Sequence, residues 1–149
     1  MSPALVEVLA ARLSALRLED LPPAVVHRAT LAVLDTMGAM LAGSRTEEGL
    51  AVAGALVELD GLGTSSVFGS DVRLSPSNAA MANGTSAHAR ELDDFGGCGH
   101  SGAVVVPAVL AAAEAARAPG GRVIEAIVAG YEAAARVTEA AGGYRAHND

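Results

Sequence analysis

The segment Gly102–Arg117, GAVVVPAVLAAAEAAR, decides the fold class of this 149-residue chain. It is apolar on every side up to Glu114, and its length and small residues favour a helix. A helix without a polar face has to be covered by other elements, so we expect it at the centre of a helical bundle. The apolar run Gly102–Ala113 is too short to span a bilayer and contains Pro107.

Five further helices are predicted around this segment, because apolar residues recur at helical spacing and Pro or Gly punctuates the ends. Ser75 and Pro76 form a typical N-cap and first helical residue. Gly38 lies inside a predicted helix at a cost of about 1 kcal/mol relative to Ala, which suggests a close helix crossing there. The residues 65–69 could be extended but do not justify a sheet. The predicted ranges are 3–16, about 24–42, 47–59, 76 to 88 or 92, and about 122–140.

The composition excludes several classes of protein. Hydrophobic residues make up 51% of the chain, which excludes general disorder, and aromatics only 3%, so the core is expected to consist of Ala, Val, Leu and Met. A net charge of −7 without a basic stripe argues against nucleic-acid binding. All ten basic residues are Arg, which excludes a lysine Schiff base within this chain. The single cysteine, Cys98, excludes an internal disulfide. Because the sequence shows no secretory leader, we expect a cytoplasmic protein without membrane association. We expect it to be all-α and to form one domain over residues 1–149.

The candidate site lies in Asn83–Gly102, NGTSAHARELDDFGGCGHSG, which holds two of the four histidines and three carboxylates. Titratable groups concentrated among apolar helices are typical of acid–base chemistry on a small molecule. His100 directly precedes the apolar helix, whose first residues, Ser101 and Gly102, have backbone N–H groups that could receive a substrate carboxylate. The arrangement indicates removal of a proton from a carbon beside a carboxylate.

Neighbouring carboxylates are expected to support His100 as a general acid or base. Asp94 or Glu91 would orient its imidazole. If the preceding helix continues, His88 and Glu91 lie three residues apart on one face. Asp93 and Asp94 would then fall at a helix C-terminus, where negative charge is unfavourable, which hints at a functional role.

These residues also have interpretations that are purely structural. His88 is equally well explained as a core histidine that bonds the backbone or Glu91. Asp93 and Asp94 are a common helix-end pair, and Cys98 has no base at a diagnostic spacing. A mixed metal set from the two histidines and two aspartates is conceivable, but the spacing matches no tight metal motif, so we expect no metal.

The sequence resembles the MmgE/PrpD family, which includes 2-methylcitrate dehydratase, cis-aconitate decarboxylase and iminodisuccinate epimerase. The resemblance is carried by NG-x-x-x-H followed by an acidic cluster, then His-x-Gly-x-x-x-x-Pro. Further matching pieces extend it over nearly the whole chain: DLPPAVVHRATLAVLDTMGAMLAG, SSVFGSDVRLSPSNAAMANGTSAHARELDD, HSGAVVVPAVLAAAEA and VIEAIVAGYEAAARV.

The resemblance implies a large helical domain that complete members join to a smaller lid domain, with the active site between them. It implies lyase activity on small di- or tricarboxylates without a metal or organic cofactor, typically in a dimer. The family's acidic active-site segment corresponds to Glu91, Asp93 and Asp94, its loop histidine to His100, and the histidine after Asn-Gly to His88. We expect His100, Asp94, Glu91 and Asp93 to be catalytic, and His88, Ser101 and Gly102 to bind substrate.

This chain departs from the family pattern in two ways. Glu91 stands where the family commonly has Asp, and Phe95 where it often has Thr, which argues against a decarboxylase. The reaction that we expect is 2-methylcitrate dehydratase-like. Complete members are several-fold longer, so the lid and further catalytic residues would lie outside this chain. The alternative hypothesis is therefore a non-catalytic truncated fragment or a split subunit that needs a complementary chain.

Overall fold

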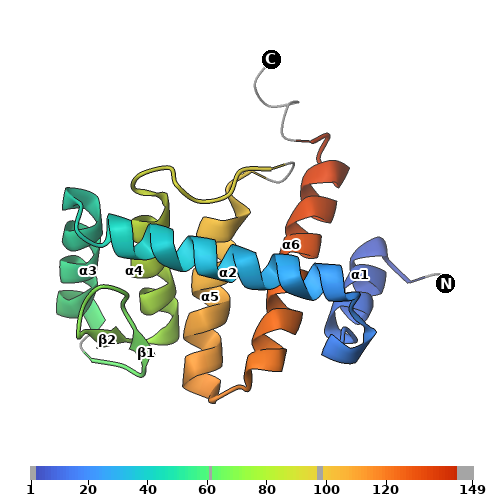
Figure 1. Cartoon of the computed structure of the whole chain (residues 1–149), viewed down its shortest axis with the longest axis horizontal. Coiled ribbons are helices and arrows are strands. Elements are labelled where there is room, and N and C mark those ends of the chain that lie inside the picture. The colour runs from blue at the N-terminus through green and yellow to red at the C-terminus, as the bar shows by residue number, and fades with distance from the viewer. Residues whose placement is uncertain (1–2, 61, 97–98, 144–149) are drawn as a thin grey trace.

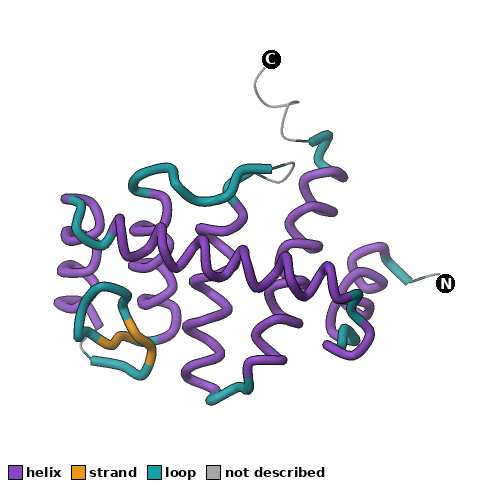
Figure 2. The backbone as a smooth tube through the Cα atoms, viewed as in Figure 1, coloured by secondary structure: helices purple, strands orange, loops and turns teal. Residues whose placement is uncertain are grey.

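The computed structural model describes residues 3–60, 62–96 and 99–143, and within these ranges the chain is almost entirely helical (Figure 2). Each predicted helix is present, with ends within two residues of the predicted ones. Cys98 lies outside the described residues. The elements are α1 (Leu5–Ser14), a 3-10 turn η1 (Leu18–Asp20), α2 (Pro23–Gly43), α3 (Glu47–Asp60), β1 (Ser65–Ser66), β2 (Arg73–Leu74), α4 (Pro76–His88), α5 (Ser101–Ala116) and α6 (Gly120–Ala140).

The long helix α2 lies across α4, α5 and α6 and contacts all three (Figure 1). Helices α4 and α5 form the most extensive helix pair, and α6 packs on the other side of α5. Helix α1 contacts α6 at one end of the molecule, and α3 packs on α4 at the other. The all-α class predicted from the sequence is confirmed.

The strands β1 and β2 pair antiparallel as a minimal hairpin at the N-terminal end of α4. Asn83, almost completely buried on α4, accepts a hydrogen bond from the Phe68 backbone N–H at 2.8 Å and donates one to the Ser66 carbonyl at 2.9 Å. Glu114 of α5 accepts hydrogen bonds from the backbone N–H and hydroxyl of Ser66 and pairs with Arg73. These polar contacts tie the hairpin to both central helices.

The close crossing of α2 occurs at Gly43, not at Gly38 as predicted. A Cβ atom at Gly43 would lie 1.7 Å from the backbone oxygen of Ser86 on α4, whereas a Cβ at Gly38 would meet nothing within 4 Å. Gly38 is exposed, and Gly43 is buried at the end of α2, where the chain turns into α3. The α2–α4 contact is therefore a direct approach of two backbones.

A second close approach joins α4 to α5. Pro107 lies inside α5 and has no N–H to donate to the Ala103 carbonyl one turn earlier. That carbonyl oxygen lies against Gly84 of α4, where an added Cβ would be 2.8 Å away. A glycine on one helix thus accommodates a carbonyl that a proline has left without its helical partner.

The buried hydrophobic residues are mainly Ala, with Val, Leu, Met and Ile, which agrees with the expected aliphatic core. The centre of α5 is only partly covered, however: Val106 is fully buried, whereas Val104 is 70% exposed and Ala108 is exposed. The expectation that α5 is enclosed on all sides is wrong for this face, because α2, α4 and α6 cover its other sides and no described element covers this one.

Helix α2 is long and apolar enough to cross a bilayer by length and composition alone, with a mean hydropathy of 1.2 over its most apolar window. Core helices of soluble proteins pass the same test, so this is weak evidence. Asp35 is exposed on this helix. The expected absence of membrane association stays a prediction.

Candidate active site

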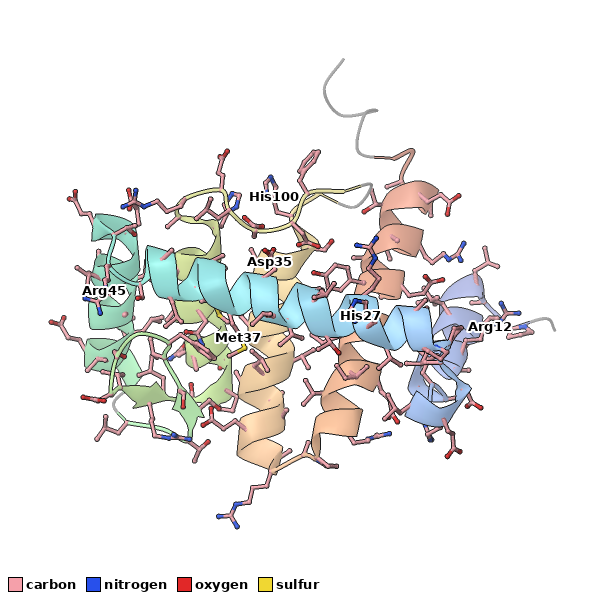
Figure 3. All side chains as sticks on the ribbon, in the orientation of Figure 1. Arg12, His27, Asp35, Met37, Arg45 and His100 are labelled. Carbon is pink, nitrogen blue, oxygen red and sulfur yellow. The ribbon has the colours of Figure 1, made fainter. Side chains whose placement is uncertain are left out.

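The structure brings His88 and His100 together although they come from different elements. His88 is the last residue of α4, and His100 occupies the N-cap position of α5. The two imidazole rings meet edge to face with their centroids 4.5 Å apart. Figure 3 shows His100 where the α4–α5 connection meets α5. The two ends of this connection are thereby held next to each other.

Asp93 is the carboxylate shared by both imidazoles. Its Oδ1 atom lies 3.1 Å from Nδ1 of His88, and its Oδ2 atom lies 3.2 Å from Nδ1 of His100. The Asp93 side chain is completely buried, whereas those of His88 and His100 are 47% and 32% exposed. If each Nδ1 carries its proton, both imidazoles donate to Asp93, and each Nε2 atom is left with a free lone pair.

The prediction that Asp94 or Glu91 orients His100 is wrong. Helix α4 ends at His88, so Glu91 is not on a helical face; it is exposed and has a left-handed backbone with φ of 48°. Among the described residues, no hydrogen bond or ion pair connects the Glu91 carboxylate to either imidazole. The neighbouring residue Asp93 takes the orienting position instead.

Asp94 caps helix α5, and this corrects two further expectations. Its Oδ1 atom accepts the Gly102 N–H at 2.7 Å, so this N–H is already bound and is not free for a substrate carboxylate. A carboxylate at a helix N-terminus is favoured by the helix dipole. Asp94 therefore does not occupy the unfavourable C-terminal position inferred from the sequence. Ser101 is buried in the same first turn.

Both imidazoles line one end of a groove of about 800 Å³ between α4 and α5, here called the histidine groove. Apolar side chains form most of its wall, among them Met81 and Val104, which are 58% and 70% exposed. Within the described part of the chain, Thr85 and Glu48 are the other polar side chains in the wall, and no arginine lines it. Sequence reasoning missed Met81 and Thr85, although they lie seven and three residues before His88 and therefore on the same helical face.

A second cavity of about 800 Å³ lies between α2 and α6. Its wall is mainly apolar, with Ile127 at its base and Asp35, Arg28 and Tyr131 as polar contributors. Asp94 also reaches this wall, while the two imidazoles do not. The acidic pair of adjacent residues therefore divides its side chains between two faces of the molecule, Asp93 toward the histidines and Asp94 toward α2 and α6.

The fold and the site define a helical domain with two histidines coupled through a buried carboxylate. The sequence profile of the MmgE/PrpD N-terminal domain matches residues 7–148. The chain belongs to the MmgE/PrpD family.

Two curated relatives match the same region. The cis-aconitate decarboxylase-like protein oryM of Aspergillus oryzae is 34% identical over 135 residues, which cover 84% of this chain and 28% of the relative. The cis-aconitate decarboxylase of Aspergillus terreus is 32% identical over 134 residues, which cover 85% of this chain and 27% of the relative. The chain thus spans less than a third of the length of these relatives.

Proposed function

We propose that this domain contributes the paired histidines of a MmgE/PrpD-type lyase site for a small di- or tricarboxylate. The observation that carries the proposal is the position of Asp93 between the two imidazoles. A buried carboxylate that accepts Nδ1–H fixes the ring orientation and leaves Nε2 as a base. Family membership and the relatives' names support lyase chemistry of this general kind.

In the proposed reaction, Nε2 of His100 removes a proton from a carbon beside a substrate carboxylate. In a dehydration, the electron pair of the broken C–H bond forms a double bond as the neighbouring hydroxyl group leaves. The His100 imidazolium formed by the proton removal donates this proton to the hydroxyl group, which departs as water. His88 shares Asp93 with His100 and borders the same groove, so it is placed to contact the substrate there.

Decarboxylation is the second candidate reaction, and the relatives' names favour it. Carbon dioxide then leaves from the substrate, the electron pair stays on carbon, and an imidazolium returns a proton to it. Dehydration and decarboxylation use the same proton-transfer group on the same class of acid. The products distinguish them, since one reaction releases water and the other releases carbon dioxide.

Among the described residues, the histidine groove has no cation for a substrate carboxylate: no arginine of this part of the chain lines it, and the sequence contains no lysine. The N–H of Gly102 is bound to Asp94. We therefore propose that the carboxylate-binding cation comes from outside the described residues, from the remainder of a longer polypeptide, a second copy or a complementary chain.

The test is turnover of citrate, 2-methylcitrate and cis-aconitate, followed by NMR of the products, in an assembly that contains this domain. We expect His100→Ala to abolish turnover and His27→Ala, on the exposed surface of α2, to leave it unchanged. Asp93→Asn should lower the rate by roughly 10²- to 10⁴-fold, because the amide no longer favours the required orientation and tautomer of the imidazole. Unchanged turnover in His100→Ala would refute the proposed role.

A further inference from the structure

We propose that His88, Asp93 and His100 together bind one divalent transition-metal ion of the Zn²⁺ or Co²⁺ type. The inference goes beyond the proposed function and does not depend on it. It rests on the relative positions of the three side chains and on the burial of the carboxylate. The sequence alone argued against a metal because the spacing of these residues matches no compact motif.

The first observation is the separation of the candidate ligand atoms. One ligand atom from each of the three residues lies within 4.8 Å of the other two. The Nδ1 atoms are 3.1 and 3.2 Å from the two oxygens of Asp93. Ligands on a tetrahedral ion with bonds of about 2.0–2.1 Å are separated by roughly 3.3 Å, so these distances suit either a proton or a metal ion between the groups.

The second observation concerns charge. The Asp93 side chain is completely buried, and its ion-pair partners among the described residues are the two imidazoles. A buried carboxylate is costly unless a positive charge lies beside it, and a divalent cation held by both imidazoles would supply that charge.

The third observation concerns access and ligand type. Both imidazoles are partly exposed at the histidine groove, which leaves room for water or a small acid in the remaining coordination positions. Two imidazoles and one carboxylate suit Zn²⁺, Co²⁺ or Fe²⁺, whereas Mg²⁺ and Ca²⁺ prefer oxygen ligands. Asp94 does not join the set, because it caps α5.

A metal ion takes the Nδ1 lone pair, so the single proton of a neutral imidazole then sits on Nε2, and Nε2 can no longer accept a proton from the substrate. The ion would displace the two Nδ1–H···Asp93 hydrogen bonds. In an active assembly it would therefore act as an inhibitor that competes with the acid–base chemistry. This consequence is separate from the binding itself, which is measured without any substrate.

The experiment is a titration of the 149-residue chain with Co²⁺ at neutral pH, followed by visible absorption. We expect saturation at one Co²⁺ per chain, displacement by Zn²⁺ and no displacement by Mg²⁺. His88→Ala, His100→Ala and Asp93→Asn should each weaken Co²⁺ binding at least tenfold, because each removes a ligand. His27→Ala and His147→Ala are the matched controls and should bind as tightly as the unaltered chain.

Circular dichroism of each variant shows whether it keeps its helices, and His88→Ala is the decisive variant because His88 is half exposed. No saturable absorption in the unaltered chain would overturn the proposal. Binding that survives in folded His88→Ala, or that is lost in His27→Ala, would overturn it as well. Loss of turnover in His100→Ala without any Co²⁺ binding would leave the proposed function standing and remove only the metal site.

Discussion

Replacing Gly43 with Ala tests the helix crossing that positions α4 and, with it, His88. The added Cβ would lie 1.7 Å from the Ser86 carbonyl oxygen. Ordinary van der Waals contact begins at 3.4 Å, so the two backbones would have to separate by about 1.7 Å. Neither partner is a flexible side-chain end that could move aside. The buried cluster of Ala39, Met40, Ala87 and Ala103 would loosen at the same time.

The same substitution at Gly38, five residues earlier on α2, is the matched control. Nothing lies within 4 Å of its added Cβ, so only helix propensity changes, and stability should rise by about 1 kcal/mol. At Gly43 the gain in propensity opposes overpacking of about 3 kcal/mol, which leaves a net loss of about 2 kcal/mol. The two variants are therefore expected to differ by about 3 kcal/mol with opposite signs.

The assay is urea and thermal unfolding of the chain followed by circular dichroism. At roughly 3 °C per kcal/mol for a domain of this size, Gly43→Ala should lower Tm by about 6 °C and Gly38→Ala should raise it by about 3 °C. If Gly43→Ala fails to fold, that result also agrees with the predicted loss of stability. Equal or greater stability of Gly43→Ala would show that the α2 and α4 backbones do not meet at this point.

Three further predictions concern polar contacts, each measured by denaturant unfolding. Asp94→Ala removes the acceptor for the Gly102 N–H and should cost about 1 kcal/mol, whereas unchanged stability would mean that Asp94 does not cap α5. Asn83→Ala leaves the Phe68 N–H without its acceptor and should cost about 1–3 kcal/mol; a neutral effect would show that the hairpin is held by other contacts. The Ser66 backbone N–H, assisted by Arg73, lowers the pKa of Glu114 below its ordinary value of 4.5, so the native state favours the ionised carboxylate. The ionised carboxylate therefore stabilises the native state above pH 4.5, and this stabilisation is lost as the pH falls through the lower native pKa. At pH 7, Glu114→Gln should be less stable than the unaltered chain by under about 1 kcal/mol, because the site is partly exposed. The difference in stability between the two proteins should shrink in acid.

The helices could be predicted from the sequence because their signals are local. Ser75 and Pro76 mark the start of α4, and apolar spacing marks the helical faces. Which glycine supports a crossing could not be predicted. Gly38 and Gly43 look alike in sequence, and only the partner helix determines that Gly43 faces a backbone.

The segment that holds the candidate site could be chosen from the sequence, but the pairings of its side chains could not be predicted. The sequence left the end of α4 open between His88 and Leu92, and the expected pairing of Glu91 required the longer helix. The helix ends at His88, and the chain turns there. In such a turn, adjacent carboxylates point in different directions, and the choice between Asp93 and Asp94 depends on how the turn folds back onto His88 and the start of α5. The non-helical backbone between α4 and α5 carries no periodic signal from which this choice could be inferred.

The contact between Pro107 and Gly84 makes these two positions depend on each other. Pro107→Ala would restore an N–H group, return the Ala103 carbonyl to the hydrogen-bond ladder of α5 and relieve the crowding at Gly84. Gly84→Ala should then be better tolerated than it is next to the proline, which a double-mutant cycle would reveal as non-additivity. As related sequences diverge, the order of substitutions at these two positions would matter. Pro107 can be replaced first, and only afterwards can Gly84 be replaced at little cost in stability.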